Sequence, residues 1–428
     1  MASQNSHYRW FVVVVFFFFV LLHQTDKLMI GSLQVPISET FRLNAFQWGL
    51  VNSGALAVAT VLYPLWGYLY DRYARARLLA LASFIWGATT WLNAIVRTYT
   101  GFLITRASTG IDDSSYPGIF TLIADYFGPN LRGKVYGILQ LAQPLGFLAG
   151  LMLGQLVAPM IGGWRSVFFI TGALGLVVAL LIYFGVKEMP RGRAEPEFEN
   201  MPEMTTVRFS WAEARQIFRK KTMWFIFLQG FAGVFPWNVI IFFFFGYLET
   251  ERGYDANAII ATMAPVILIL AAGYFVGGYL GDFLFKYTTR GRIIVSSLGV
   301  LLGALFIYLA LTTPVGQPDR FFVFMCLTAI FMPLSSANVI ATVYDVTVPE
   351  VRSTAHAMEY FIENSGAVAA PALTGAIVVA TGDLTFAILS ICVIAWLLCF
   401  FFYIGALFTI DHDARTLRVQ MAERARAM

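Results

Sequence analysis

The sequence predicts an all-α polytopic membrane protein with twelve transmembrane helices in two pseudo-symmetric six-helix bundles, and three observations support this fold class. Of the 428 residues, 58% are hydrophobic and only 13% are charged, whereas about a quarter of the residues in soluble domains are charged. About twelve apolar segments are long enough to cross a bilayer. A single long polar stretch divides these segments into two sets of six. A soluble globular protein is therefore excluded.

The predicted elements follow one another in four parts. We expect an N-terminal bundle at 1–186, a cytoplasmic linker with an amphipathic helix at 187–221, a C-terminal bundle at 222–410 and a cytoplasmic tail at 411–428. The first apolar run lacks a small-residue cleavage site, so a retained helix is favoured over a signal peptide. The predicted spans are 8–35, 46–70, 78–97, 100–126, 134–159, 164–186, 222–248, 256–284, 292–313, 320–343, 354–380 and 384–409.

The Lys and Arg residues indicate how the chain is oriented. With a cytoplasmic N-terminus, 22 of the 29 basic residues fall inside and 5 outside, while Lys27 and Arg106 remain within the membrane. Such an excess is typical of cytoplasmic loops, so both termini are expected inside the cell, with the protein in the inner membrane. In the linker, residues 210–221 alternate apolar and basic side chains at helical spacing, which predicts a helix on the cytoplasmic leaflet.

The two halves share short patterns. Gly67-Tyr-Leu-Tyr-Asp71 closes the second predicted span, and Gly278-Tyr-Leu-Gly-Asp282 closes the eighth. Matching patterns in two six-helix halves suggest internal duplication, which is the usual plan of secondary transporters. Two rows of glycines recur every four residues and predict close helix packing; they are Gly146, Gly150 and Gly154, and Gly273, Gly277 and Gly281.

The fourth span carries charges where hydrocarbon is expected. Arg106, Asp112 and Asp113 lie in this segment, and charged residues in a membrane are costly unless they are paired or face water. In a continuous helix Asp113 lies about two turns beyond Arg106, on nearly the same face. We therefore expect Arg106 and Asp113 to work as a pair, and Asp112 receives no role. The alternative is an ion pair that only steadies the bundle.

The first span adds three polar residues. His23, Asp26 and Lys27 are spaced so that all three can face one cavity. Asp26 and Lys27 could neutralise each other or exchange partners with Asp113 and Arg106. Alternatively, they only mark the outer end of the helix.

The eleventh span repeats this arrangement with acids. His356, Glu359 and Glu363 follow one helical face, with Asn364 beside them. In a low-dielectric cavity, a carboxyl group without a fixed cation can hold a proton near neutral pH, as a proton-coupled carrier requires. The rival interpretation is that these carboxyl groups bind a cationic head group or hold helices together.

The seventh span suggests a further contact with substrate. Trp237 and Asn238 follow Pro236, where a break in the helix could expose backbone polar groups. Such kinks also occur without any binding role.

Several other classes of function are excluded by the sequence. The chain has no phosphate-binding loop, no metal-ligand spacing and no set of nucleophile, base and orienting residue, so an enzyme and an ATP-driven pump are disfavoured. Its three cysteines show no zinc or disulfide spacing. We expect no cofactor, no metal and no nucleic acid partner, and a monomer surrounded by membrane lipids.

The segment from Gly67 to Arg77 resembles the signature of the major facilitator superfamily between the second and third helices, although Ala74 stands where glycine is usual. Arg106 to Gly110 resembles the fourth-helix element of that family. The resemblance implies alternating access about a central cavity between the halves. It also implies gating roles for Asp71, Arg72 and Asp282.

Within that superfamily the sequence is most similar to the Spinster-like lipid transporters. His23-Gln-Thr-Asp26-Lys27 resembles their first-helix pattern, and Gly110-Ile-Asp-Asp113-Ser-Ser-Tyr116 resembles their fourth helix, with Asp113 at the usual Glu. The resemblance implies proton-linked movement of a lysolipid or sphingoid-type lipid. The anion:cation symporters share some of these elements, which implies an organic carboxylate as the alternative substrate. The predicted substrate and proton site comprises Asp26, Lys27, Arg106, Asp113, Glu359, Glu363, Trp237 and Asn238.

Overall fold

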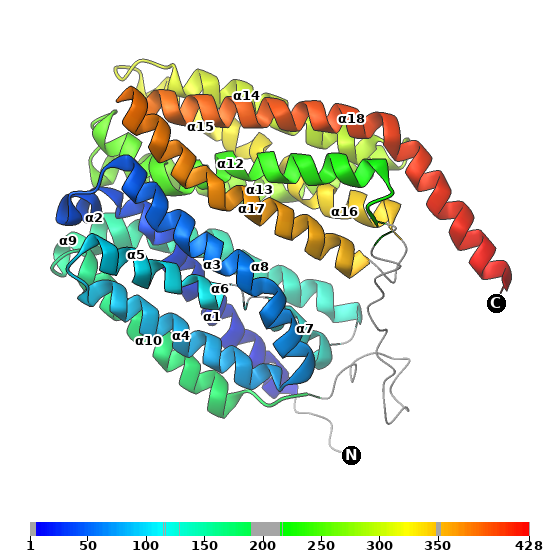
Figure 1. The fold of residues 1–428 in the computed structure, drawn as a ribbon, viewed down its shortest axis with the longest axis horizontal. Coiled ribbons are helices and arrows are strands. Elements are labelled where there is room, and N and C mark those ends of the chain that lie inside the picture. The colour runs from blue at the N-terminus through cyan, green and yellow to red at the C-terminus, as the bar shows by residue number, and fades with distance from the viewer. Residues whose placement is uncertain are drawn as a thin grey trace. The chain divides into compact units, whose positions relative to one another are not determined.

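The computed structural model describes residues 6–113, 115, 117–127, 129–189, 215, 217–347 and 352–427. These residues form helices and turns with no strand, so the predicted all-α fold is confirmed. The chain forms two compact units, Met1–Thr206 and Val207–Met428 (Figure 1). Each unit is described by itself below.

Unit 1 is built from α-helices and one short π-helix. Asn44 caps α3, since its side chain accepts from the Gln47 amide while the Gln47 side chain accepts from the Asn44 amide. Thr98 caps α5 through the Gly101 amide. The helices are α1 (Ser6–Ser32), α2 (Gln34–Phe41), α3 (Ala45–Arg72), α4 (Arg75–Ile95), α5 (Tyr99–Ser108), α6 (Gly110–Asp113), α7 (Pro117–Tyr126), α8 (Pro129–Met152), η1 (Leu153–Val157), α9 (Ala158–Met160) and α10 (Trp164–Gly185).

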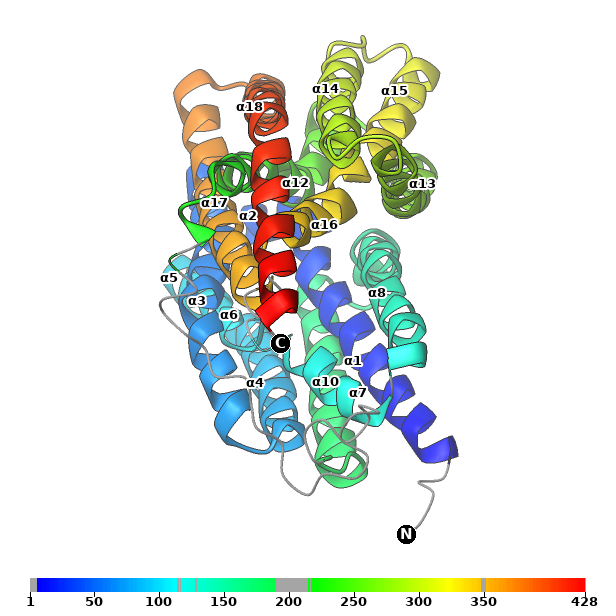
Figure 2. The ribbon, with the colours of Figure 1, turned by 90° about the vertical axis from the view of Figure 1, so that its right-hand side faces the viewer.

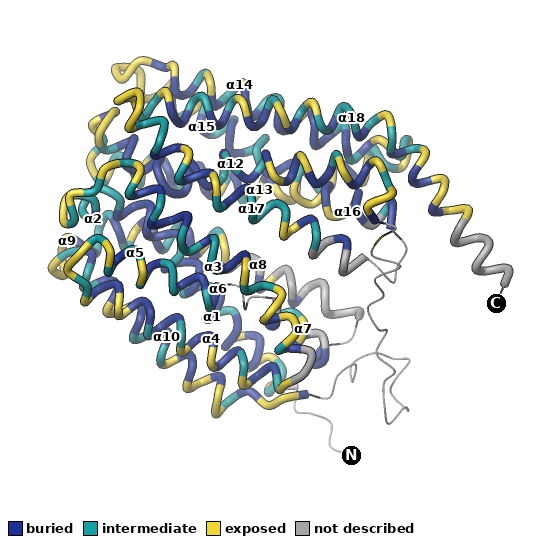
Figure 3. Tube along the Cα trace, in the orientation of Figure 1, coloured by how far each residue is buried: buried dark blue, intermediate teal, exposed yellow. Residues whose placement is uncertain are grey.

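Glycines bring the helices of unit 1 close together. α1 lies along α8, and α4 lies along α10 (Figure 2). A Cβ atom on Gly150 of α8 would lie 2.8 Å from the Thr25 carbonyl oxygen of α1, so a larger residue would push the two backbones apart. Buried and exposed residues alternate with the helical turn along α4 and α10 (Figure 3). One face of each helix is therefore covered while another remains open, as in helices that meet lipid.

The predicted span at 100–126 is not one continuous helix. It is divided into α5, α6 and α7, with turns at Thr109 and Ser115. Pro117 opens α7, which fits the tolerance of proline in the first helical turn but not in a helix interior. Eleven other helices among the described residues are long and apolar enough to cross a membrane. The fourth predicted segment is thus a broken helix at the place where its charges lie.

Unit 2 contains a second broken span. The helix that begins as α15 passes through the 3-10 turn η3 and continues as α16. α12 packs against both α17 and α18 and is the most buried of the long helices of this unit. The helices are α12 (Lys221–Thr250), α13 (Ala256–Phe285), α14 (Gly291–Leu311), α15 (Pro318–Phe331), η3 (Met332–Ser335), α16 (Ser336–Val346), α17 (Arg352–Thr381) and α18 (Leu384–Ala427).

Some predicted features lie outside the described part of the chain. Half of the amphipathic helix expected at 210–221 falls there, as do the side chains of Asp71, Arg72 and His356. The Arg292 guanidinium lies 2.8 Å from Asp282 and also pairs with Asp345, and the gating role of Asp282 stays a prediction.

A buried ion-pair cluster joins α4, α7 and the residues that follow α10. The Arg75 guanidinium lies 2.5 Å from Asp125 and 2.9 Å from Glu188, and it donates to the Met189 carbonyl oxygen at 3.0 Å. Glu188 also accepts from the Ala76 amide at 2.8 Å. Only 5% of Arg75 is exposed. One side chain thus ties together three segments that are distant in sequence.

Arg75→Met should lower the free energy of unfolding by about 3 kcal/mol, because breaking a buried ion pair leaves its carboxylates without a counter-charge. Chemical unfolding in detergent micelles measures this change. Arg77→Met is the matched control, since Arg77 lies on the same helix and is exposed. Equal stability of the two variants would contradict the assignment of Arg75 as a structural tie.

Candidate functional site

Unit 1 gathers a group of charged side chains inside the membrane-spanning region, which we name the N-terminal cluster. They come from α1, α5 and α6, and the breaks that bound α6 set the positions of the two acids. Since lipid offers no hydrogen bonds, irregular backbone at this depth is tolerated only where protein or a cavity surrounds it. The cluster comprises His23, Asp26, Lys27, Arg106, Asp112 and Asp113.

Lys27 and Asp113 form an ion pair within this cluster. The Lys27 ammonium donates to both carboxylate oxygens of Asp113, at 2.8 and 2.9 Å. The expected pairing of Asp113 with Arg106 is wrong for this structure. Counting two turns between the residues assumes an unbroken helix, whereas the helix is interrupted at Thr109.

Asp112, to which the sequence assigned no role, is bound by a histidine. The His23 Nε2 atom lies 2.8 Å from Asp112 Oδ2, and both residues are buried. The His23 ring also contacts the rings of Phe19 and Trp86. The helical spacing of His23 predicted that it can face a cavity, but the local sequence does not indicate that Asp112 is its partner.

Asp26 is held by uncharged groups. Its carboxylate accepts from Thr171 at 2.9 Å and from Trp86 and Thr90 at 3.2 Å each. It is 2% exposed. Three donors of this kind satisfy a carboxylate without a neighbouring cation. Asp26 and Lys27 therefore do not neutralise each other, which was one of the expected arrangements.

Arg106 differs in its contacts from the other charged residues of the N-terminal cluster. Only 4% of it is exposed, and its Nε atom has no hydrogen-bond partner. Among the described residues, no carboxylate lies within 4.0 Å of its guanidinium, although Asp26, Asp113 and Asp112 act on it through space. A buried cation without direct partners is costly. The site is thus prepared to receive a negatively charged group.

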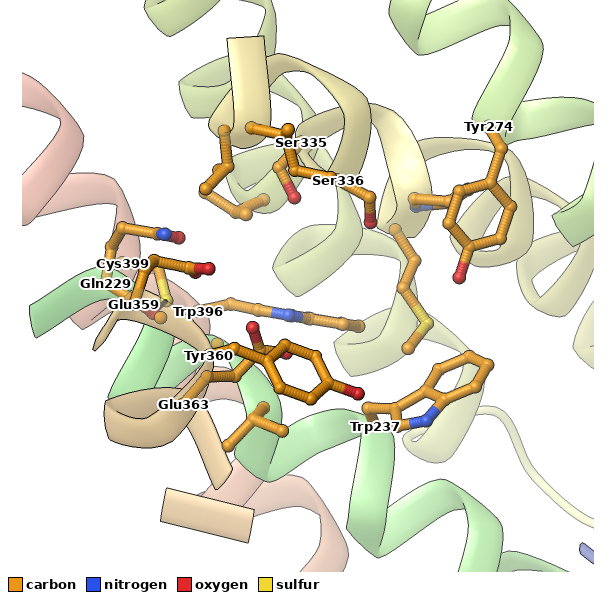
Figure 4. Close-up of a pocket in the computed structure, with 18 of the residues that line it drawn as sticks. Gln229, Trp237, Tyr274, Ser335, Ser336, Glu359, Tyr360, Glu363, Trp396 and Cys399 are labelled. Atoms are coloured by element: carbon orange, nitrogen blue, oxygen red, sulfur yellow. Dashed lines mark hydrogen bonds between the residues drawn. The ribbon is translucent and has the colours of Figure 1, made fainter. Parts of the chain in front are cut away.

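Unit 2 holds a cavity of about 290 Å³, which we name the C-terminal cavity. Figure 4 shows the acids Glu359 and Glu363 of α17 beside aromatic side chains, with the broken span on the other side. The two carboxyl groups lie one helical turn apart on α17, and no Lys or Arg is among the described residues that line the cavity. The lining residues are Gln229, Gly230, Gly233, Val234, Trp237, Leu270, Tyr274, Val300, Met332, Pro333, Ser335, Ser336, Val339, Ile340, Glu359, Tyr360, Glu363, Trp396 and Cys399.

The structure places the residues predicted for this half unevenly. Glu359, Glu363 and Trp237 line the C-terminal cavity, whereas Asn238 is not among the lining residues. The Asn238 amide instead donates to the Val234 carbonyl oxygen at 2.9 Å, one turn back on α12. Asn364 likewise donates to Tyr360 of its own helix, at 2.7 Å. These two amides satisfy backbone groups of their own helices.

Sequence reasoning missed Gln229 and Tyr403 in this half. Tyr403 of α18 donates to the Gln229 side-chain oxygen at 2.7 Å, and Gln229 borders the C-terminal cavity. A lone glutamine in an apolar span was a usable signal, because polar groups in a membrane face the bundle interior. Its partner Tyr403 lies 174 residues away, so the sequence around Gln229 does not indicate it.

Comparison with known proteins identifies the family of this chain. Residues 15–316 match the family model described as Major Facilitator Superfamily. The chain belongs to the Major Facilitator Superfamily. It is therefore a multi-pass membrane transporter, as its fold, its motifs and its apolar helices predicted.

Relatives support the narrower resemblance as well. Protein spinster of Drosophila melanogaster is 27% identical over 86% of this chain, which spans only 62% of the length of that protein. Protein spinster homolog 1 of Homo sapiens is 26% identical over 83% of this chain and 70% of that protein. The hexuronate transporter of Bacillus subtilis is 26% identical over 86% of this chain and 88% of its own length.

Solved structures show the same fold. A bacterial homolog to the human lysosomal transporter Spinster superposes with a TM-score of 0.79 at 22% identity, covering 96% of this chain and 98% of that one. The nucleoside transporter NupG superposes with a TM-score of 0.70 at 14% identity. The predicted similarity to Spinster-like transporters is confirmed.

Proposed function

We propose that this superfamily member is a secondary active transporter that works by alternating access. It couples protons to the movement of a lysolipid or sphingoid-type lipid with an anionic head group across the inner membrane, with both termini in the cytoplasm. The observation that carries this proposal is the buried guanidinium of Arg106, whose Nε atom has no hydrogen-bond partner among the described residues.

An anion would complete the surroundings of Arg106. A guanidinium offers a planar fork of donors that matches a phosphate or carboxylate with two parallel hydrogen bonds. Because the group is already desolvated, an incoming anion gains the attraction without the full cost of removing a cation from water. Lys27 is committed to Asp113, so Arg106 is the better anchor for the substrate.

Coupling to protons is supported by the carboxyl groups of both units. Glu359 and Glu363 lie one helical turn apart and both line the C-terminal cavity, and repulsion between two neighbouring carboxylates favours the binding of a proton by one of them. Glu363 or Glu359 can thus release or take up a proton. The same acids could instead hold the cationic end of a substrate, because aromatic rings flank them.

The alternative function is a symporter of organic carboxylates. The similarity to a hexuronate transporter over 86% of the chain favours it. Arg106 would bind the carboxylate in the way described for a phosphate. The two functions therefore share the anion site and differ in the apolar part of the substrate.

Reconstitution in liposomes tests whether the protein carries a lipid or an organic carboxylate. Purified protein should take up a fluorescent lysophosphatidate when an inward proton gradient is imposed, and collapsing the gradient with an ionophore should slow uptake several-fold. Glucuronate is tested in parallel as a water-soluble carboxylate. Uptake of glucuronate alone would support the carboxylate symporter, and uptake of both substrates at rates independent of the gradient would contradict proton coupling.

A further inference from the structure

We propose that His23 and Asp112 form the proton-binding site of the N-terminal cluster. The inference rests on the proposed proton-coupled function and assigns the proton to particular atoms. The proton is held at the imidazole of His23 and stabilised by the carboxylate of Asp112.

The hydrogen bonds of the cluster single out this pair. Protonation of Asp113 would remove the negative charge that pairs with Lys27, and protonation of Asp26 would disturb three donors. The pair has one bond, and two of its atoms, Nδ1 of His23 and Oδ1 of Asp112, are buried without a partner. A proton added to the imidazole strengthens the existing bond to Asp112. It breaks no other contact.

The pH range in which histidine usually changes its charge also favours His23 as the group that holds the proton. Histidine is the residue whose unperturbed charge change falls between pH 5 and 8. The His23 ring contacts the rings of Phe19 and Trp86, which restrict its orientation beside the acid. Asp113 approaches the same Nε2 atom at 4.0 Å and adds a second negative charge that favours the imidazolium.

The charges around the pair link proton binding to anion binding. Apart from His23, the charged groups of the N-terminal cluster comprise three carboxylates and two cations, so neutral His23 leaves one net negative charge and imidazolium leaves none. An anion that reaches Arg106 therefore meets less repulsion when His23 is protonated, and each ligand raises the affinity for the other. These groups are Asp26, Asp112, Asp113, Lys27 and Arg106.

Transport variants test the assignment. In liposomes, uptake of the lysophosphatidate or carboxylate carried by the unsubstituted protein should change about tenfold between pH 5.5 and 7.5. In His23→Asn and Asp112→Asn the change should fall below about twofold. His412→Asn is the matched control, because His412 is exposed on α18, and it should keep the full pH dependence.

A second measurement needs no substrate. Nitrogen NMR of histidine-labelled protein in detergent should contain one signal that is missing from His23→Asn and that titrates between pH 5 and 8. The assignment is overturned if that signal does not titrate there, or if His23→Asn keeps the pH profile while Asp113→Asn loses it. If the protein transports neither substrate but the His23 signal titrates, the proposed function is contradicted and the proton site remains supported.

Discussion

Arg106→Gln should reduce transport at least 100-fold. Losing the charge-assisted hydrogen bonds to a bound anion and leaving that anion buried without a partner costs about 3 kcal/mol or more, and every 1.4 kcal/mol corresponds to a factor of about ten. Arg106→Lys keeps the charge but loses the two-pronged geometry, so we expect a loss of about tenfold. Initial rates of uptake into liposomes measure both effects.

The stability of the same variant separates substrate binding from a structural role. Because Arg106 is a buried cation with no ion-pair partner among the described residues, replacing it with an uncharged residue should leave the thermal unfolding temperature unchanged or raise it. Arg320→Gln is the control, since Arg320 is exposed at the start of α15, and it should transport normally. If Arg106→Gln unfolds at a lower temperature and cannot be purified, Arg106 holds the bundle together instead.

The helical content could be predicted because hydrophobic length reports membrane spans directly. The fold and the family follow from segments such as 8–35 and from the motif after the second span. The segment at 100–126 was apolar enough to be predicted as one helix, and its division at Thr109 and Ser115 depends on contacts with other helices. A Cβ atom on Gly110 would lie 2.8 Å from the Ala59 amide of α3, for example.

The polar partners were harder to predict than the polar residues. Asp113 forms its ion pair with Lys27, which lies 86 residues away, and the sequence left this pairing as one of two open alternatives. Asp112 had no assigned role because His23 is 89 residues away. Spacing along one helix indicates which residues share a face. It carries no information about which residue of another helix they meet.

The C-terminal cavity depends on a close contact between α13 and the broken span. Gly277 of α13 lies against the backbone of Leu334 in η3, where an added Cβ atom would be 2.6 Å from the Cα atom and 2.7 Å from the carbonyl oxygen. Asn338 of α16 donates to the carbonyl oxygens of Gly277 and Leu334, at 2.9 and 2.8 Å. This amide satisfies a carbonyl group that the break would otherwise leave unpaired.

Gly277→Val should therefore prevent the folded protein from accumulating in the membrane. Its side chain meets backbone atoms that cannot rotate away, so α13 and η3 must separate and the two bonds from Asn338 are lost. Overpacking alone costs about 1 to 3 kcal/mol, and the unpaired carbonyl groups add about 1 to 3 kcal/mol each. Size-exclusion chromatography of the detergent-solubilised protein should show little or no monodisperse material.

The neighbouring glycine provides the control. A Cβ atom on Gly278 would meet Ala337 at 3.6 Å, which is an ordinary van der Waals contact, so Gly278→Val should yield folded protein. The two variants differ by one position on the same helix and share the same change in volume and helix propensity. If both fold equally well, the backbone contact at Leu334 does not hold the broken span in place, and the shape of the C-terminal cavity must come from the side chains of α12 and α17.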